Sequence, residues 1–223
     1  MKTEKNSIAD TCGLWVLFLG LIVFSGGVHA QDKPASSQHD GKVKAFLEAH
    51  RHQWRDMNVP ASDGQLLYDI ILEKGYTSGL EIGTSTGHST IWIAWAMSKT
   101  GGKLITIELD KGRYEEALAN IREAGLEEYV DARLANAHDL VKQLEGPFDF
   151  VFSDADKDWY VNYFMDLEHK LESGGCFVAH NVRPRGEGGM RGTIEYLDYV
   201  MGLDGYSTRV DNSGGGMAIS YKN

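Results

Sequence analysis

Residues 79–90, GLEIGTSTGHST, say more about the fold of this 223-residue chain than any other stretch, because an apolar strand there leads into a glycine turn and then a helix. Gly83 and Gly87 allow the backbone to turn sharply and allow a ligand to approach it closely. Ser89 or Thr90 can cap the apolar helix that follows. Doubly wound α/β proteins hold nucleotides at this kind of junction, so the stretch predicts a nucleotide-type ligand.

The spacing within the turn is E-x-G-x-x-x-G, formed by Glu81, Gly83 and Gly87. Dinucleotide folds use G-x-G-x-x-G and P-loops use G-x-x-x-x-G-K-[ST], and this turn fits neither pattern. The turn therefore disfavours a nicotinamide oxidoreductase. A plain strand-to-helix loop that binds no ligand is the alternative interpretation of the turn. The turn resembles the first motif of class I methyltransferases that use S-adenosylmethionine (SAM). This resemblance implies SAM contacts from Glu81, Gly83, Thr84, Ser85, Gly87 and Ser89.

Apolar strand patterns alternate with helical patterns along the rest of the chain. We expect strands at residues 80–83, 104–108, 129–134, 148–153 and 176–179. We expect helices at residues 42–57, from 62 or 63 onward, and at 89–98, 114–125, 140–144, 160–171 and 190–201. Such alternation predicts a parallel sheet with helices on both faces.

The last segment has a different pattern, in which two short strands, 207–210 and 217–221, flank a glycine-rich turn. This pattern predicts a hairpin. The expected fold is therefore doubly wound α/β, with a mostly parallel seven-stranded sheet and one antiparallel edge hairpin strand. An antiparallel strand inserted at the sheet edge adds to the resemblance to the Rossmann-like methyltransferase fold.

The first 30 residues have the pattern of a secretory signal. Lys2 and Lys5 precede an apolar run at residues 14–24, and small residues follow up to Ala30. We expect cleavage after Ala30 and a secreted or periplasmic protein. An uncleaved membrane anchor is the alternative, although the run is shorter than the roughly 20 residues of a spanning helix.

Composition limits the partners of the remaining chain. The net charge is −10, and without a basic stripe this argues against nucleic acid or an anionic membrane as a partner of the mature domain. Residues 31–41 are polar and are expected to form a disordered linker, and residues 42–223 to form one domain. Cys176 is the only cysteine beyond residue 30, so an internal disulfide is excluded there.

Polar residues end several of the expected strands. Glu108 lies 25 residues after Gly83, where an acid can accept the hydroxyls of a ribose, and a solvated acid is the alternative. Asp154 follows the fourth strand, and His180 with Asn181 ends the fifth. Because ligands bind at the carboxyl ends of strands in such sheets, we expect these three side chains to lie together. An acid, an imidazole and an amide oxygen can hold a divalent metal.

Together these stretches resemble the cation-dependent O-methyltransferases, which include the catechol and caffeoyl-CoA O-methyltransferases. The similarity spans about residues 42–222 and is most specific at residues 154–158, DADKD. It implies a SAM-dependent O-methyltransferase that moves a methyl group to a hydroxyl of a small acceptor of the catechol kind. A homodimer is the assembly that the resemblance implies.

The resemblance also implies roles for single residues. Glu108 would hold the ribose of SAM, and Ala137 would contact the adenine. Asp154 would bind both the metal and the region near the methyl donor. Lys157 would be the general base, and Asn181 a metal ligand.

His180 departs from the family, which usually has Asp-Asn at this place. A neutral imidazole can bind a metal, but one negative charge is lost, which disfavours Mg and favours softer metals among the candidates Mg, Mn and Zn. Alternatively the metal is lost and His180 itself takes a proton. Residues 182–189 depart too and are expected to form a substrate lid.

Two other functions stay open. One is a metal-independent methyltransferase that acts on another acceptor. The other is a non-catalytic, exported SAM-binding protein, because SAM is made in the cytosol.

Overall fold

The computed structural model describes residues 33–55 and 57–223, and the predicted signal segment, residues 1–30, lies outside these ranges. No helix within them is long and apolar enough to cross a membrane.

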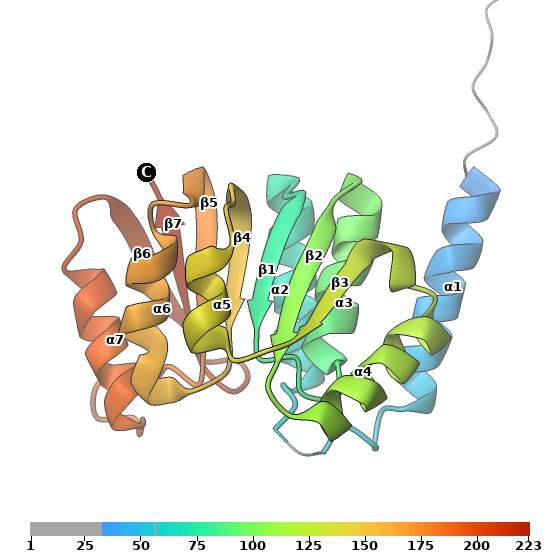
Figure 1. Cartoon of the computed structure of the whole chain (residues 1–223), viewed down its shortest axis with the longest axis horizontal. Coiled ribbons are helices and arrows are strands. Elements are labelled where there is room, and N and C mark those ends of the chain that lie inside the picture. The colour runs from blue at the N-terminus through green and yellow to red at the C-terminus, as the bar shows by residue number, and fades with distance from the viewer. Residues whose placement is uncertain (1–32, 56) are drawn as a thin grey trace, which may run out of the picture.

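The described residues form one seven-stranded sheet in the order β3-β2-β1-β4-β5-β7-β6 (Figure 1). Its strands are β1 (Ser78–Ile82), β2 (Lys103–Glu108), β3 (Val130–Leu134), β4 (Phe148–Ser153), β5 (Leu171–His180), β6 (Tyr206–Asp211) and β7 (Met217–Lys222). Strands β1 to β5 pair in parallel, whereas β7 runs antiparallel to both β5 and β6. This confirms the predicted doubly wound sheet with one antiparallel strand near its edge.

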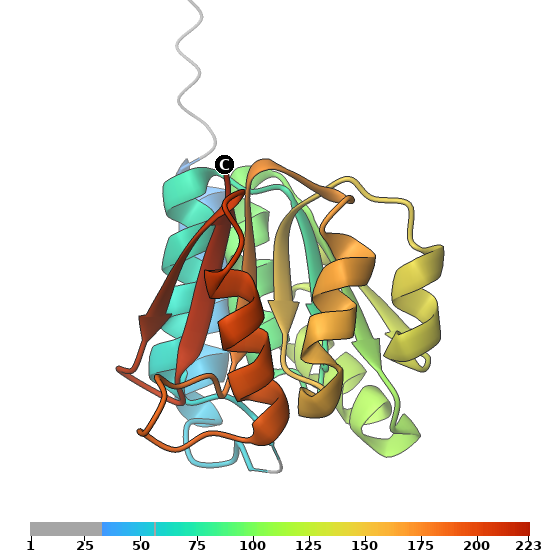
Figure 2. The ribbon, with the colours of Figure 1, turned by 90° about the vertical axis from the view of Figure 1, so that its left-hand side faces the viewer.

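Helices cover both faces of the sheet (Figures 1 and 2). They are α1 (Lys33–Ala49), α2 (Ala61–Lys74), α3 (His88–Thr100), α4 (Lys111–Ala124), α5 (Ala137–Gln143), α6 (Tyr160–Leu167) and α7 (Arg191–Met201). The apolar faces of α2 and α3 pack with one side of the sheet, and those of α5, α6 and α7 pack with the other. Helix α1 packs against α3 and α4.

The central strand β4 shows how the sequence supports two covered faces. Phe150 and Phe152 pack in the cluster with α2 and α3, whereas Val151 packs in the cluster with α5 to α7. All three side chains are fully buried. Side chains alternate between the faces of a strand, so an uninterrupted apolar run is what a strand buried on both faces requires.

Helix α1 differs from the expectation at both ends. It includes most of the predicted linker, residues 31–41, and it ends well before residue 57. Asp40 explains the docking of this polar segment, because it accepts a 2.7 Å hydrogen bond from Trp95 Nε1 and pairs with Lys99. Local composition does not reveal partners that lie on another helix.

Strand β5 begins five residues earlier than predicted, and α6 ends earlier than predicted, at Leu167. Leu171 pairs with Phe148 and Cys176 pairs with Phe150, so the register shifts between these pairs. Residues 172–175 therefore lie opposite the single residue Asp149, although the sequence pattern places them in the connection between a helix and the next strand.

Candidate functional site

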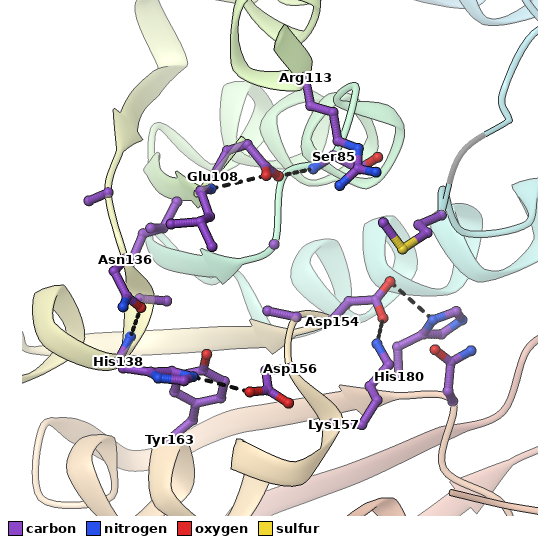
Figure 3. A pocket seen from close by; sticks show the side chains of 18 of the residues that line it. Ser85, Glu108, Arg113, Asn136, His138, Asp154, Asp156, Lys157, Tyr163 and His180 are labelled. Carbon is purple, nitrogen blue, oxygen red and sulfur yellow. Dashed lines mark hydrogen bonds and ion pairs between the residues drawn. The ribbon is translucent and has the colours of Figure 1, made fainter. Parts of the chain in front are cut away.

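The carboxyl ends of β1 to β5 surround a cavity of about 600 Å³ (Figure 3). The helices that follow β1, β3 and β4 begin beside it, as a doubly wound sheet dictates. Residues on five strand ends, on the loop before α2 and on the loop before α7 line it: Met57, Asn58, Gly83, Ser85, Ile107, Glu108, Leu109, Arg113, Ala135, Asn136, Ala137, His138, Asp154, Ala155, Asp156, Lys157, Tyr163, His180, Asn181 and Met190.

The glycine turn brings backbone from two strands together at the cavity. Gly83 has φ of +100°, and a Cβ there would lie 2.8 Å from the backbone oxygen of Asp154. Only glycine satisfies both the left-handed backbone and this close approach. Ser85 follows with φ of +49°, and its N–H donates a 2.7 Å hydrogen bond to Glu108 Oε2.

Glu108 is held in place by backbone donors from two loops. Besides Ser85, the N–H groups of Leu109 and Asp110 donate to Glu108 Oε1 at 3.0 and 2.9 Å. The carboxylate lines the cavity (Figure 3), and Oε2, which accepts one of these three bonds, retains acceptor capacity. This arrangement suits an acid that accepts hydroxyl groups of a ligand.

Glu81 lies beneath the turn and does not line the cavity. It is fully buried and accepts hydrogen bonds from the hydroxyls of Ser89, Thr90 and Thr106 at 2.5 to 2.6 Å. Burial raises the pKa of Glu81 to about 7, despite the three hydroxyl donors, which act in the opposite direction. It joins β1, β2 and the start of α3 and thereby supports the turn.

The predicted SAM contacts therefore divide into two groups. Gly83, Ser85, Glu108, Ala137 and Asp154 line the cavity. The others are placed behind it, where they support the turn: Glu81, Thr84, Gly87 and Ser89.

A wall of planar groups follows β3. Asn136 begins α5, where its side chain accepts a 3.0 Å hydrogen bond from the N–H of His138. The His138 ring stacks on Trp159 with centroids 4.1 Å apart, and its Nε2 lies 3.4 Å from Asp156 (Figure 3). Asn136, His138 and Tyr163 line this side of the cavity, which suits a flat heterocycle.

Asp154, Lys157 and His180 meet at the other end (Figure 3), and of these contacts the sequence analysis predicts the one between Asp154 and His180. Lys157 Nζ donates to Asp154 Oδ1, and His180 Nδ1 lies 3.2 Å from Asp154 Oδ2. Lys157 also lies 5.3 Å from the centre of the Tyr160 ring. A carboxylate is thus shared by a lysine and an imidazole at the cavity surface.

The sequence analysis missed Asp63, at the start of α2. His180 Nε2 and Asp63 Oδ2 lie 2.7 Å apart, and both side chains are buried. Burial alone lowers the pKa of His180, but Asp154 and Asp63 outweigh burial and raise the pKa to about 9. An acid shortly after Pro60 is also typical of the first turn of a helix, so the sequence did not indicate that Asp63 contacts His180.

A divalent metal, which the resemblance implies, finds a partial ligand set here. Asp154 and His180 face each other, and Asn181 lines the same end of the cavity with φ of +57°. His180 Nδ1 is buried and lies 3.2 Å from Asp154 Oδ2, but it makes no aligned hydrogen bond. The donor set fits a metal that takes nitrogen as well as oxygen. Among the described residues, no group of three His, Cys, Asp or Glu side chains could hold a metal ion, so a metal here would need Asn181 as a third protein ligand.

Other expectations fare differently. The substrate lid remains a prediction, although Met190, just beyond residues 182–189, lines the cavity. An aromatic acceptor pocket formed by Trp95, Trp159 and Tyr160 is conceivable from the sequence, but none of these three residues lines this cavity. Met57 and Asn58 do line it, and they lie in a segment to which the sequence pattern assigned no role.

Comparison with known proteins places these features in context. A family model described as O-methyltransferase matches residues 35–188. Catechol O-methyltransferase of Niastella koreensis is 44% identical over 107 residues, which cover 46% of this chain and 48% of that protein. Caffeoyl-CoA O-methyltransferase 1 of Eucalyptus globulus is 34% identical over 137 residues, which cover 59% and 55%. These matches span about half the length of the relatives.

Two solved structures share the fold over most of both chains. The O-methyltransferase from Bacillus cereus in complex with SAH has a TM-score of 0.70 and 25% identity, with 82% of this chain and 91% of that chain covered. The O-methyltransferase TomG from Streptomyces achromogenes, in complex with SAM, has a TM-score of 0.69 and 26% identity, with 82% and 89% covered.

Proposed function

Because this chain belongs to the O-methyltransferase family, we propose that it transfers a methyl group from SAM to a hydroxyl oxygen of a small acceptor. One observation carries the proposal. A single cavity joins the Glu108 carboxylate at one end to the Asp154–Lys157 pair at the other, and the Gly83 turn contacts both. A site that must hold a nucleoside beside a reacting hydroxyl needs both ends.

The first end accommodates the nucleoside part of SAM. Glu108 accepts the ribose hydroxyls, and the wall formed by Ala137, His138 and Tyr163 receives the adenine. Gly83 allows the donor to approach the backbone where β1 and β4 meet. Holding two reactants in one cavity supplies proximity and orientation, which is a large effect for a two-substrate reaction.

Lys157 is the group that takes the proton. SAM supplies a methyl group whose bond to sulfur breaks as the acceptor oxygen attacks it. Lys157 Nζ accepts the proton of that hydroxyl, and the adjacent Asp154 carboxylate stabilises the ammonium that forms. Met57, Asn58 and Met190 border the acceptor side, which suits a small, largely apolar acceptor such as a catechol.

When a metal is bound, Asp154, His180 and Asn181 would hold it, and it would lower the pKa of a coordinated acceptor hydroxyl. A metal-independent methyltransferase is the second candidate. It is favoured by the side-chain partners that these acids already have in this structure, since Asp154 contacts Lys157 and His180, and Asp63 contacts His180. Turnover that is insensitive to a chelator supports the second candidate.

Calorimetric titration of the protein with SAM tests the proposal. We expect micromolar binding that Glu108→Ala weakens at least tenfold, while Glu115→Ala, an exposed acid on α4, leaves it unchanged. Transfer of a labelled methyl group from SAM to a catechol is the second readout. An absence of SAM binding in the folded protein would refute the proposal and favour the non-catalytic alternative.

A further inference from the structure

Asp63 is a buried carboxylate whose two nearest hydrogen-bond partners lie outside its own helix. It lies in the first turn of α2, with 1% of its surface exposed. Its Oδ2 accepts a 2.8 Å hydrogen bond from the N–H of Gly215 and contacts His180 Nε2 at 2.7 Å. Burying a carboxylate is costly unless such partners are present, so its place beneath the cavity requires an explanation.

The β6–β7 turn is shaped around this pair. A Cβ at Gly214 would lie 1.5 Å from Asp63 Oδ1, and a Cβ at Gly215 would lie 2.5 Å from His180 Nε2. Neither glycine has a positive φ, so close packing, rather than backbone conformation, requires glycine at both positions. Three separate segments, namely α2, the end of β5 and the hairpin, therefore converge on one imidazole.

The contact with Asp63 determines which nitrogen of His180 faces the cavity end. When Nε2–H donates to Asp63, Nδ1 is directed at Asp154 Oδ2, 3.2 Å away. Two ligands bound about 2.1 Å from one metal at right angles lie about 3 Å apart, which matches this separation. Histidines that bind metals commonly donate their other N–H to a carboxylate, and this outer partner fixes the tautomer and the ring orientation.

We propose that Asp63 is a positioning residue that presents His180 Nδ1, together with Asp154 and Asn181, to a transition metal in preference to Mg²⁺. Mg²⁺ prefers an all-oxygen shell, whereas Mn²⁺, Co²⁺ and Zn²⁺ accept imidazole. The inference rests on the proposed function, because the metal would bind in the cavity where the methyl transfer is proposed to occur. It adds that His180 and Asp63 act as a unit and set the choice of metal.

Metal binding to the whole protein tests this inference without any use of turnover. Co²⁺ is titrated while its visible absorption is recorded, and Mg²⁺ and Mn²⁺ are each used as competitors. We expect one Co²⁺ per chain, displaced by Mn²⁺ at far lower concentration than by Mg²⁺. Asp63→Asn should weaken Co²⁺ binding 10- to 100-fold. The matched control is Asp69→Asn, which alters an exposed acid on the same helix.

His180→Asp provides the opposite change, because it gives the site a second carboxylate in place of the imidazole. We expect this variant to gain affinity for Mg²⁺ relative to Co²⁺. Circular dichroism and thermal melting establish that each variant is folded. If Asp63→Asn does not fold, the comparison of His180→Asp with the unaltered protein still tests whether the imidazole sets the choice of metal, and an unchanged preference would overturn the inference.

Three further outcomes would overturn the inference: no divalent metal binds, Mg²⁺ competes as well as Mn²⁺, or folded Asp63→Asn binds Co²⁺ as tightly as Asp69→Asn. SAM binding is measured on the same samples. A protein that binds SAM but no metal refutes the role of Asp63 and leaves the proposed function standing.

Discussion

Lys157 carries the most direct prediction at the scale of single residues. In the proposed reaction, Lys157 accepts a proton while its Nζ contacts Asp154. Lys157→Met removes this proton acceptor and leaves the nucleoside end of the cavity unchanged. We expect turnover to fall about 10²- to 10⁴-fold, the usual contribution of a general base. SAM affinity, measured by calorimetry, should change less than threefold. Unchanged turnover would rule out the assigned role, and Lys142→Met, an exposed lysine on α5, is the control.

Glu81 predicts a pH dependence of stability. Because burial raises its folded-state pKa from 4.5 to about 7, the folded protein binds more protons than the unfolded chain between these values. The free energy of unfolding should therefore fall as pH rises from about 4.5 to 7, and the contribution of Glu81 should be constant above that. The full effect is at most about 3 kcal/mol.

Denaturant unfolding at pH 5 and pH 8 measures this effect. Glu81→Gln should reduce the difference between the two pH values, since glutamine has no proton to lose. Glu73→Gln, which alters an exposed glutamate on α2, should leave the difference as it is in the unaltered protein. Equal pH dependence in both variants would contradict the assignment.

At the scale of elements, the junction between β1 and α3 depends on Gly83. Alanine there would have both a left-handed backbone and a Cβ pressed against the backbone of Asp154. We expect Gly83→Ala to destabilise the protein by about 1–3 kcal/mol and to weaken SAM binding at least tenfold. Thermal melting and calorimetry measure the two effects.

Gly41→Ala is the matched control for this change. Gly41 lies within α1, and a Cβ there meets nothing within 4 Å. Alanine in a helix interior should raise the free energy of unfolding by about 0.5–1 kcal/mol. If both alanines had the same effect, the close approach at Gly83 would not be the cause.

At the scale of the whole molecule, α1 is attached to the domain by one polar anchor and an apolar face. Asp40 accepts a hydrogen bond from Trp95 and pairs with Lys99, while Val43 and Phe46 are buried against α3 and α4. Burial opposes the charge on Asp40, but Lys99 and Trp95 outweigh it and hold the pKa of this carboxyl below its usual value.

We expect Asp40→Ala to lower the free energy of unfolding by about 1–2 kcal/mol, because Trp95 Nε1 loses its acceptor. Limited proteolysis should then cut the chain before α2 faster than in the unaltered protein. The control is Glu48→Ala, an exposed acid on the same helix. Unchanged proteolysis and melting would show that the apolar face alone holds α1.

The order of local patterns along the chain was enough to predict the sheet, its antiparallel strand and the family. Each depends on residues that are close in sequence: the apolar run of β4, the glycine turn at Gly83, and the DADKD stretch at residues 154–158. The carboxyl ends of parallel strands lie at one edge of the sheet, so Asp154, His180 and Asn181 could be placed in one site in advance.

The partner of His180 could not be predicted in this way, because Asp63 is 117 residues away and reaches it only when α2 docks against the sheet. The side chain of Glu81 accepts hydrogen bonds from buried hydroxyl groups and does not line the cavity, and this could not be predicted either. The alternation of side chains along a strand does not say which face of the sheet holds hydroxyl donors. Periodicity records which side of an element is buried, whereas the packing of distant elements decides which polar groups meet there. The sequence thus specified the sheet and the cavity, and tertiary packing assigned the histidine its carboxylate.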